Sequence, residues 1–179
     1  MLTAPAQDGN WTHEKGLVVG PRVTPEDVAR ILGEQVAARP DCSPPPSIVL
    51  LAELPGTTDG SFVGCIEVTT TDAAASVAAP HHPPRDGYLG MLAVAPQFGS
   101  RGIGRALVAE GERVSREVYG AAAVVLFVLS VRADILLWYE RRGYARTGLR
   151  VEAASLIASI QQDAKLLVDA DFLVLRRVL

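Results

Sequence analysis

Several features that mark particular protein classes are missing from this sequence. Its 179 residues contain two cysteines, Cys42 and Cys65, which have neither metal-ligand spacing nor the number that a disulfide framework needs. The net charge of −3 provides no basic field that could hold a nucleic-acid backbone. The longest apolar run, Ala121–Leu129, is about half of the ~20 residues that span a bilayer. We therefore expect no metal site, no nucleic-acid partner and no membrane partner.

A secretory signal is also missing, because Met1–Asn10 has neither a basic start nor an apolar run. We therefore expect a cytoplasmic or nuclear protein that is not secreted. With 49% hydrophobic and 21% charged residues, the composition is that of an ordinary soluble globular protein. The length suits a single domain over residues 1–179, in which residues 1–23 form a loosely docked N-terminal arm. The sequence leaves open whether the chain forms a homodimer.

Hydrophobic periodicity predicts a succession of strands and helices. Strands are expected at Ser47–Leu54, Phe62–Thr70, Tyr88–Val94, Ala121–Val131, Tyr144–Val151 and Phe172–Val178. Helices are expected from Thr24 to before Pro40 and over Gly102–Tyr119 and Ala133–Arg142, while Leu17–Val19 is a short strand or a docked segment and Glu152–Lys165 is ambiguous with a helix favoured. The first two strands should form an antiparallel hairpin. Because Ala121–Val131 is apolar on both faces, we expect a strand paired on both sides and parallel to Tyr88–Val94.

The most informative segment is a glycine-rich turn between a strand and the longest helix. It reads LAVAPQFGSRGIGRAL over Leu92–Leu107. Glycine lets a backbone approach a ligand closely, and the free amides of a first helical turn bind anions. Arg101 and Arg105 add positive charge, so the turn favours a pyrophosphate; the alternative is a tight turn whose glycines serve packing. The pattern after Gly104 matches neither GxGxxG nor a P-loop.

This turn resembles the acetyl-CoA signature of the Gcn5-related N-acetyltransferases (GNAT), which is Gln/Arg-x-x-Gly-x-Gly/Ala after a strand that ends in Val-x-Pro. The residues from Val94 to Pro96 supply the Val-x-Pro, and Gly102 and Gly104 fall on the signature glycines. Gly99 stands at the Gln/Arg position, a departure that bears on affinity for the cofactor.

A second segment, Ser130–Gly148, resembles the later motif of the same family, Asn-x-x-Ala-x-x-Phe-Tyr-Glu-x-x-Gly-Phe. Trp138, Tyr139 and Glu140 match its aromatic-Tyr-Glu core, and Arg132 stands where the family often has Asn. With both motifs in the family's order, the resemblance covers roughly residues 62–148.

The resemblance implies a GNAT-like α/β fold, with a mixed, mostly antiparallel central sheet flanked by helices. A parallel strand pair in it should splay after Val94 to admit the pantetheine arm. Acetyl-CoA is the implied co-substrate, without a metal, and the acceptor is a small-molecule amine or a peptide amine. The residues that it places at the cofactor are Leu92, Ala93, Val94, Gly99, Ser100, Arg101, Gly102, Ile103, Gly104, Arg105, Arg132 and Trp138.

Two residues are candidates for proton transfer. Tyr139 is the candidate general acid, because a phenol with a reference pKa of ~10 stays protonated and can donate to the departing thiolate. The alternative is a core aromatic that shares a helix face with Ile135. Glu67 is the candidate general base, and its alternative is a solvent-facing carboxylate, because strand alternation does not tell which face meets the substrate. His81 and His82 precede the third strand and are more typical of solvated loop residues.

The implied reaction is direct attack of the amine on the thioester, since neither cysteine is placed for a covalent intermediate. The main alternative is an acyl-CoA-binding protein of the same fold with weak or lost catalysis. The uncertain base is its best support, and an assay of CoA release separates the two.

Overall fold

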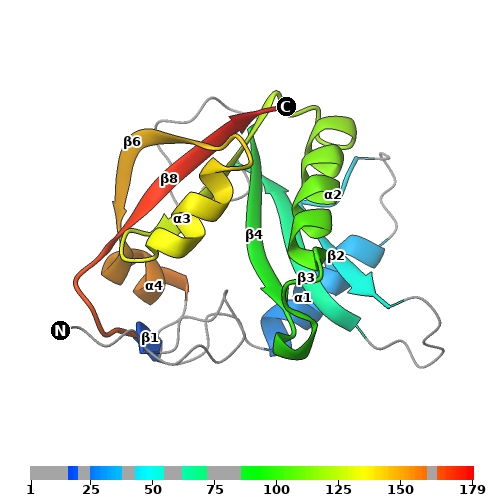
Figure 1. Cartoon of the computed structure of the whole chain (residues 1–179). Coiled ribbons are helices and arrows are strands. Elements are labelled where there is room, and N and C mark those ends of the chain that lie inside the picture. Colours follow the sequence, from blue (N-terminus) through cyan, green and yellow to red (C-terminus); the bar gives the residue numbers. More distant parts are fainter. Residues whose placement is uncertain (1–15, 20–24, 38–42, 55–61, 72–85, 161–164) are drawn as a thin grey trace.

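We describe the protein from a computed structural model (Figure 1). The structure describes residues 16–19, 25–37, 43–54, 62–71, 86–160 and 165–179. The expected helix cap at Thr24, Cys42 and the histidines His81 and His82 lie outside these residues.

A six-stranded sheet forms the centre of the molecule, in the order β2-β3-β4-β5-β8-β6. Its strands are β2 (Ser47–Glu53), β3 (Phe62–Thr70), β4 (Gly87–Val94), β5 (Ala123–Leu129), β6 (Ala145–Glu152) and β8 (Asp171–Val178). Every pairing is antiparallel except that of β4 with β5, which is parallel. The predicted mixed, mostly antiparallel sheet and its β2–β3 hairpin are confirmed.

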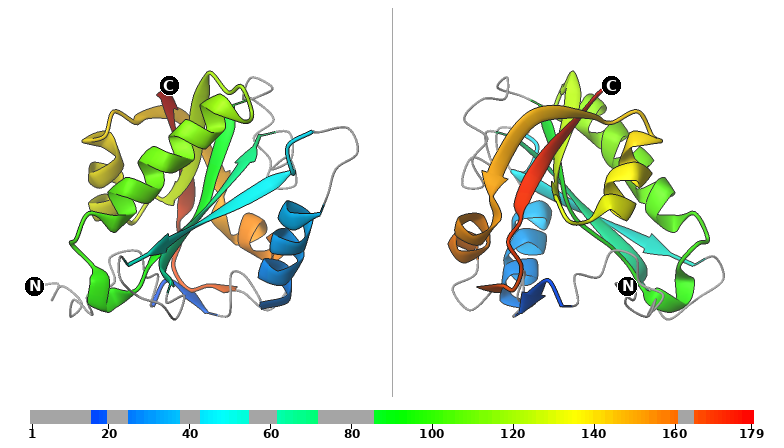
Figure 2. Two further views of the ribbon diagram at one scale, coloured as in Figure 1. Left: turned by 90° about the vertical axis from the view of Figure 1, so that its right-hand side faces the viewer. Right: turned by 60° about the vertical axis from the view of Figure 1, so that its left-hand side comes forward.

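Helices cover both faces of this sheet. They are α1 (Pro25–Val36), α2 (Ile103–Glu117), α3 (Ala133–Glu140) and α4 (Ala153–Ile160), with a short 3-10 helix, η2, at Pro96–Phe98. Helices α2 and α3 lie on one face, and α1 and α4 lie on the other (Figures 1 and 2). None of the helices in the described residues is long and apolar enough to cross a membrane.

Strand β5 is the buried axis of the sheet. It pairs with β4 on one side and with β8 on the other, and all its residues except Phe127 are buried. Its alternate side chains enter two clusters: Val124, Leu126 and Val128 pack with α2 and α3, and Leu129 packs with α4. This two-sided packing is the reason for its continuous apolar sequence, as predicted.

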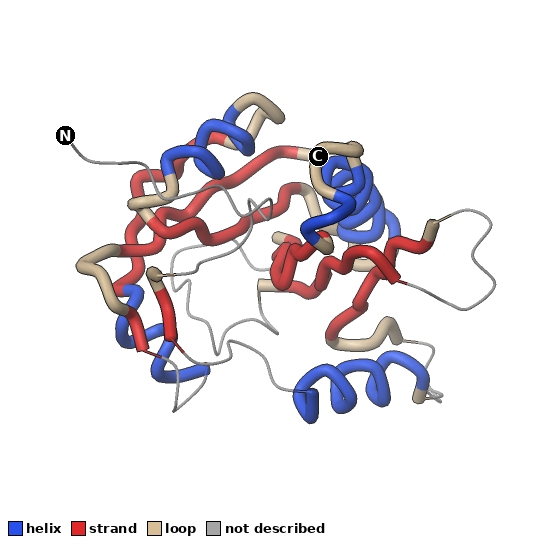
Figure 3. The backbone as a smooth tube through the Cα atoms, turned by 60° about the horizontal axis from the view of Figure 1, so that its bottom comes forward, coloured by secondary structure: helices blue, strands red, loops and turns tan. Residues whose placement is uncertain are grey.

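The point at which β4 leaves β5 differs from the prediction. We expected the splay after Val94, but the two strands pair only at Gly87 with Val124 and at Tyr88 with Val125. The cause is a bulge in β4, where Met91 has a φ of +50° and the register with β3 shifts. A bulge bends its strand and disrupts the ladder. The pairing of β4 with β5 therefore ends at Tyr88. Strands β2, β3 and β4 form one group and β5, β8 and β6 form the other, and the two groups separate from each other (Figure 3).

Two ambiguous segments of the sequence are settled by the structure. Val18–Val19 forms β1, which pairs with β7 (Lys165–Leu166) in a separate two-stranded sheet and does not join the central one. The segment for which a helix was favoured contains α4, whose Leu156 and Ile157 are buried in the cluster around Phe172. These pieces close the face of the sheet opposite α2.

Candidate active site

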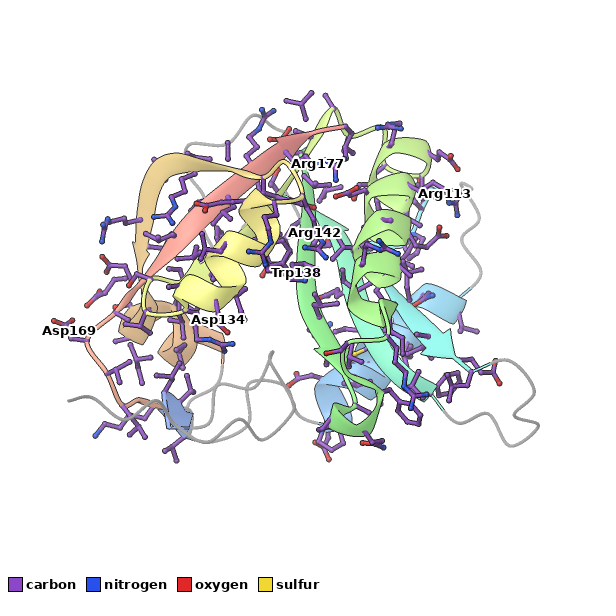
Figure 4. All side chains as sticks on the ribbon, viewed as in Figure 1. Arg113, Asp134, Trp138, Arg142, Asp169 and Arg177 are labelled. Atoms are coloured by element: carbon purple, nitrogen blue, oxygen red, sulfur yellow. The ribbon has the colours of Figure 1, made fainter. Side chains whose placement is uncertain are left out.

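A pocket of about 490 Å³ lies where β4 ends and α2 begins. Its lining consists of Val94, Phe98, Gly99, Ser100, Arg101, Gly102, Ile103, Gly104, Arg105, Trp138 and Arg142. The glycine turn and the start of α2 form one wall, and α3 contributes the other. Figure 4 shows Trp138, on α3, and Arg142, in the turn after α3, pointing toward α2.

The backbone of the glycine turn and of the start of α2 presents several amides for which no carbonyl partner is found among the described residues. Ser100 and Gly102 have φ angles of +60° and +81°, and Gly102 caps α2 without a side-chain hydrogen bond. The first-turn amides of α2 have no carbonyl within the helix to bond. The Gly99 amide, in contrast, donates to the Pro96 carbonyl at 3.0 Å, so it is already used. The anion cradle therefore begins at Ser100.

Three arginines give the pocket its charge. Among the described residues, none of Arg101, Arg105 and Arg142 pairs with a carboxylate, although acids hold arginines elsewhere in the protein. Arg101 lies over the Phe98 ring, 5.4 Å from its centroid. Helix dipole, free amides and three guanidinium groups all favour a polyanion here.

Arg142 is a pocket residue that our sequence analysis did not identify. Its guanidinium stacks on Trp138, 3.4 Å from the ring centroid, and Nη1 donates to the Trp138 carbonyl at 2.7 Å. The Nε atom is buried and has no hydrogen-bond partner among the described residues. Burial lowers the pKa of Arg142, and the neighbouring charges of Arg141 and Arg105 add to this effect. The available signal was its spacing of four residues from Trp138 in a segment predicted to be helical through Arg142, although α3 ends at Glu140 and Arg142 lies in the turn after it.

Tyr139 lies in the core beside this pocket and does not line it. Its side chain is 7% exposed and makes edge contacts with the rings of Trp138 and Tyr144, at centroid distances of 4.8 and 5.3 Å. Burial is the main cause that raises the pKa of Tyr139 well above its usual value. The phenol therefore stays protonated throughout the physiological range.

Glu67 lies on the opposite face of the sheet from α2. Ile66 and Val68, its neighbours in β3, pack against α2, so alternation directs Glu67 away from that helix. Ser47 donates a hydrogen bond of 2.6 Å to Oε1 of Glu67. The carboxylate is half-buried, and the structure does not bring it to the pocket at α2.

Three other predicted cofactor residues also lie outside the pocket lining. Leu92 packs against the main core, and Ala93 is exposed on β4. Arg132 is held by Asp134 through two bonds of 2.9 and 2.8 Å, although it stands at the start of α3.

Cys65 is a free thiol whose Sγ contacts the Met91 carbonyl at 3.5 Å, and burial raises its pKa.

Comparisons with known proteins agree with this geometry. The sequence model of the acetyltransferase (GNAT) family matches residues 24–144. Comparison with curated proteins found no match.

Solved structures with a similar fold include several acetyltransferases. Nourseothricin acetyltransferase has a TM-score of 0.53 and 24% identity, over 75% of this chain and 66% of that chain. The IAA acetyltransferase from Bacillus cereus has a TM-score of 0.57 and 14% identity, over 87% and 85%. A Bacillus anthracis protein solved in complex with acetyl coenzyme A has a TM-score of 0.53 and 15% identity, over 75% and 64%. The chain thus spans about two thirds of the length of the first and third of these.

Proposed function

The chain belongs to the GNAT acetyltransferase family, and from that membership we propose that it transfers the acetyl group of acetyl-CoA to a primary amine. The observation that carries this proposal is the pocket at the start of α2. Its first-turn amides and its three arginines, which pair with no carboxylate among the described residues, suit the phosphates of CoA, and it lies at the end of β4, beyond the part of that strand that pairs with β5. Acetyl-CoA is the co-substrate in this proposal, and no step needs a metal.

In the proposed complex, the residues from Ser100 to Arg105 hold the pyrophosphate, and Arg142 supplies charge from the other wall. The pantetheine arm then runs along the free edge of β4, between Leu92 and Val94. In the described part of the chain, no strand pairs with β4 on the β5 side after Tyr88, so this edge is proposed to take the arm. A strand edge offers unpaired backbone groups, which suit the amides of the arm.

The proposed reaction is a direct transfer. The neutral amine attacks the thioester carbonyl, a C–N bond forms, and the C–S bond breaks with the electron pair leaving on sulfur. Glu67, directly or through water, accepts the proton that the amine loses, and Tyr139 donates a hydrogen bond to the sulfur as it becomes a thiolate. Since burial raises the pKa of Cys65 and keeps its thiol protonated, a cysteine-linked intermediate is disfavoured.

An assay with a panel of primary amines tests this function. The protein, acetyl-CoA and each amine are mixed, and both free CoA and the mass of the product are measured. We expect stoichiometric CoA release and an acetylated product for at least one amine. Binding of acetyl-CoA by calorimetry without any acetylated product would show a non-catalytic binding protein, and absence of both would overturn the proposal.

A further inference from the structure

Two aromatic rings lie where the sheet opens, on the face opposite α2. Tyr88 is the last residue of β4 that pairs with β5, and Phe127 lies on β5 two residues beyond the last pair. Their ring centroids are 5.5 Å apart with an interplanar angle of 51°, and both side chains are partly exposed. Phe172 supports Phe127 from beneath, at a centroid distance of 6.4 Å. The rings therefore form a fixed, partly open apolar surface.

A carboxylate adjoins this surface. A side chain at Gly90 would begin 2.8 Å from Cε1 of Tyr88 and 3.3 Å from Oε2 of Glu67. Because Gly90 has no side chain, the Tyr88 ring can lie over the strand close to that oxygen. The other oxygen, Oε1, is oriented by Ser47. Among the described residues, no side chain donates a printed hydrogen bond to Oε2, which lies on the same side of the strand as the Tyr88 ring.

The position of this cluster relates it to the proposed reaction. Tyr139 lies in the core on the α2 side of the sheet, and the electrostatic effect of Tyr88 is the second cause, after burial, that raises the pKa of Tyr139. The two side chains are therefore close enough to interact electrostatically, although they belong to opposite faces of the sheet. A nearby basic residue, Arg176, donates hydrogen bonds of 2.7 and 3.3 Å to the buried Asp86. The charge of Arg176 is therefore already paired.

We propose that Glu67, Tyr88 and Phe127 form the acceptor site, and that they select a primary alkylammonium with no carboxylate on the carbon that bears nitrogen. This inference rests on the proposed transfer to an amine. The carboxylate attracts the ammonium, and the faces of aromatic rings attract cations and cover the attached carbons. A carboxylate next to the nitrogen would meet Glu67 as a like charge. Amino acids acetylated at the α-nitrogen are therefore poor substrates.

A matched pair of acceptors tests the selection. Phenethylamine and L-phenylalanine differ by the α-carboxylate and have the same ring and chain. We expect kcat/KM for phenethylamine to exceed that for phenylalanine by at least ~10-fold, and the ratio to shrink at high salt. Equal values for the two would overturn the inference and leave the proposed function intact.

Variants of Tyr88 and Phe127 test whether their rings bind the amine acceptor. Tyr88→Leu and Phe127→Leu should each raise KM for phenethylamine ~5-fold, the size expected of a partly exposed ring–cation contact, with KM for acetyl-CoA unchanged. Tyr88→Phe keeps the ring and should therefore raise KM for phenethylamine less than Tyr88→Leu does. Tyr119→Leu removes an aromatic at the end of α2 and serves as the control for general loss of packing. An unchanged amine KM in both leucine variants would contradict the proposal.

A binding measurement separates this inference from the reaction itself. Calorimetry of phenethylamine with the protein–CoA complex requires no turnover. We expect saturable binding that Tyr88→Leu weakens ~5-fold and that Tyr88→Phe weakens less, because it keeps the ring. If no amine is acetylated but this pattern holds, the proposed function fails while the ammonium site stands; absence of binding overturns the site.

Discussion

At the scale of single residues, Tyr139 is a core residue that lies next to the pocket without lining it. Its ring packs between Trp138 and Tyr144, and the Tyr144 hydroxyl donates to Glu112 at 2.8 Å. Arg177 holds the same carboxylate through bonds of 2.9 and 3.0 Å. These contacts hold the ring in one orientation. The proposed role of Tyr139 as a general acid therefore depends on its hydroxyl group.

Tyr139→Phe should lower the turnover of acetyl transfer by ~10²-fold or more, within the range for general acid help. The variant keeps the packed ring and removes the proton donor, so the Kd of acetyl-CoA should change little. Steady-state kinetics and calorimetry measure the two quantities. A loss below about twofold would indicate that Tyr139 is a core aromatic without a catalytic part.

Glu67→Gln should lower the rate at neutral pH by ~10²-fold if proton removal limits the reaction. The amide keeps the shape of the side chain and the bond from Ser47, but it accepts no proton. The rate should partly recover at high pH, where more of the amine arrives neutral. A small and uniform loss, with no change in the pH profile, would assign the proton to water or another group.

At the scale of elements, the start of α2 combines backbone shape with charge. Gly102 adopts a φ of +81°, which L-residues rarely adopt, and the nearest atom to an added Cβ is Nη2 of Arg105 at 3.9 Å. The space beside Gly102 is therefore open toward the pocket. A carboxylate introduced there would face the amides and arginines that the pyrophosphate is proposed to occupy.

Gly102→Glu should weaken acetyl-CoA binding by at least ~10-fold, because its carboxylate repels the pyrophosphate and fills the cradle. Gly148→Glu is the matched control: Gly148 has a φ of +85°, nothing lies within 4 Å of an added Cβ, and the residue lies on β6. Both variants should lose a similar stability of about 1–2 kcal/mol from the backbone. Calorimetry should show weakened binding in the first variant alone.

At the scale of the whole molecule, the two buried phenols make stability sensitive to alkaline pH. Burial is the largest cause that raises the pKa of both Tyr139 and Tyr144. The folded protein therefore keeps protons that the unfolded chain loses above its reference pKa of about 10. The stabilisation is fully present below that pH and decreases above it.

The free energy of unfolding should thus fall above about pH 10, by ~1.4 kcal/mol per pH unit for each of these two tyrosines. Urea unfolding at several pH values between neutral and strongly alkaline measures the slope. In Tyr139→Phe the slope should decrease by one residue's share, and in the double variant with Tyr144→Phe by two. A slope that both variants leave unchanged would contradict this origin.

The sequence by itself determined the features that depend on a few consecutive residues. Gly102 marks a position in the turn before α2 where the backbone adopts a positive φ, and this feature is visible in the sequence without any partner element. The apolar run of β5 likewise indicated burial on both faces before its neighbours were known. For the same reason the order of the elements, the hairpin of β2 with β3 and the family resemblance could all be predicted.

Tertiary structure alone decided where these elements meet. With a bulge at Met91, β4 separates from β5 after Tyr88, whereas the sequence had predicted separation after Val94. Strand β1 pairs with β7 and does not belong to the central sheet. Arg142 lines the pocket, Glu67 lies close to Tyr88, and Tyr88 contacts Phe127, because packing brought together elements that are distant in sequence. Periodicity tells which residues share a face, but the neighbour that each face meets depends on long-range packing.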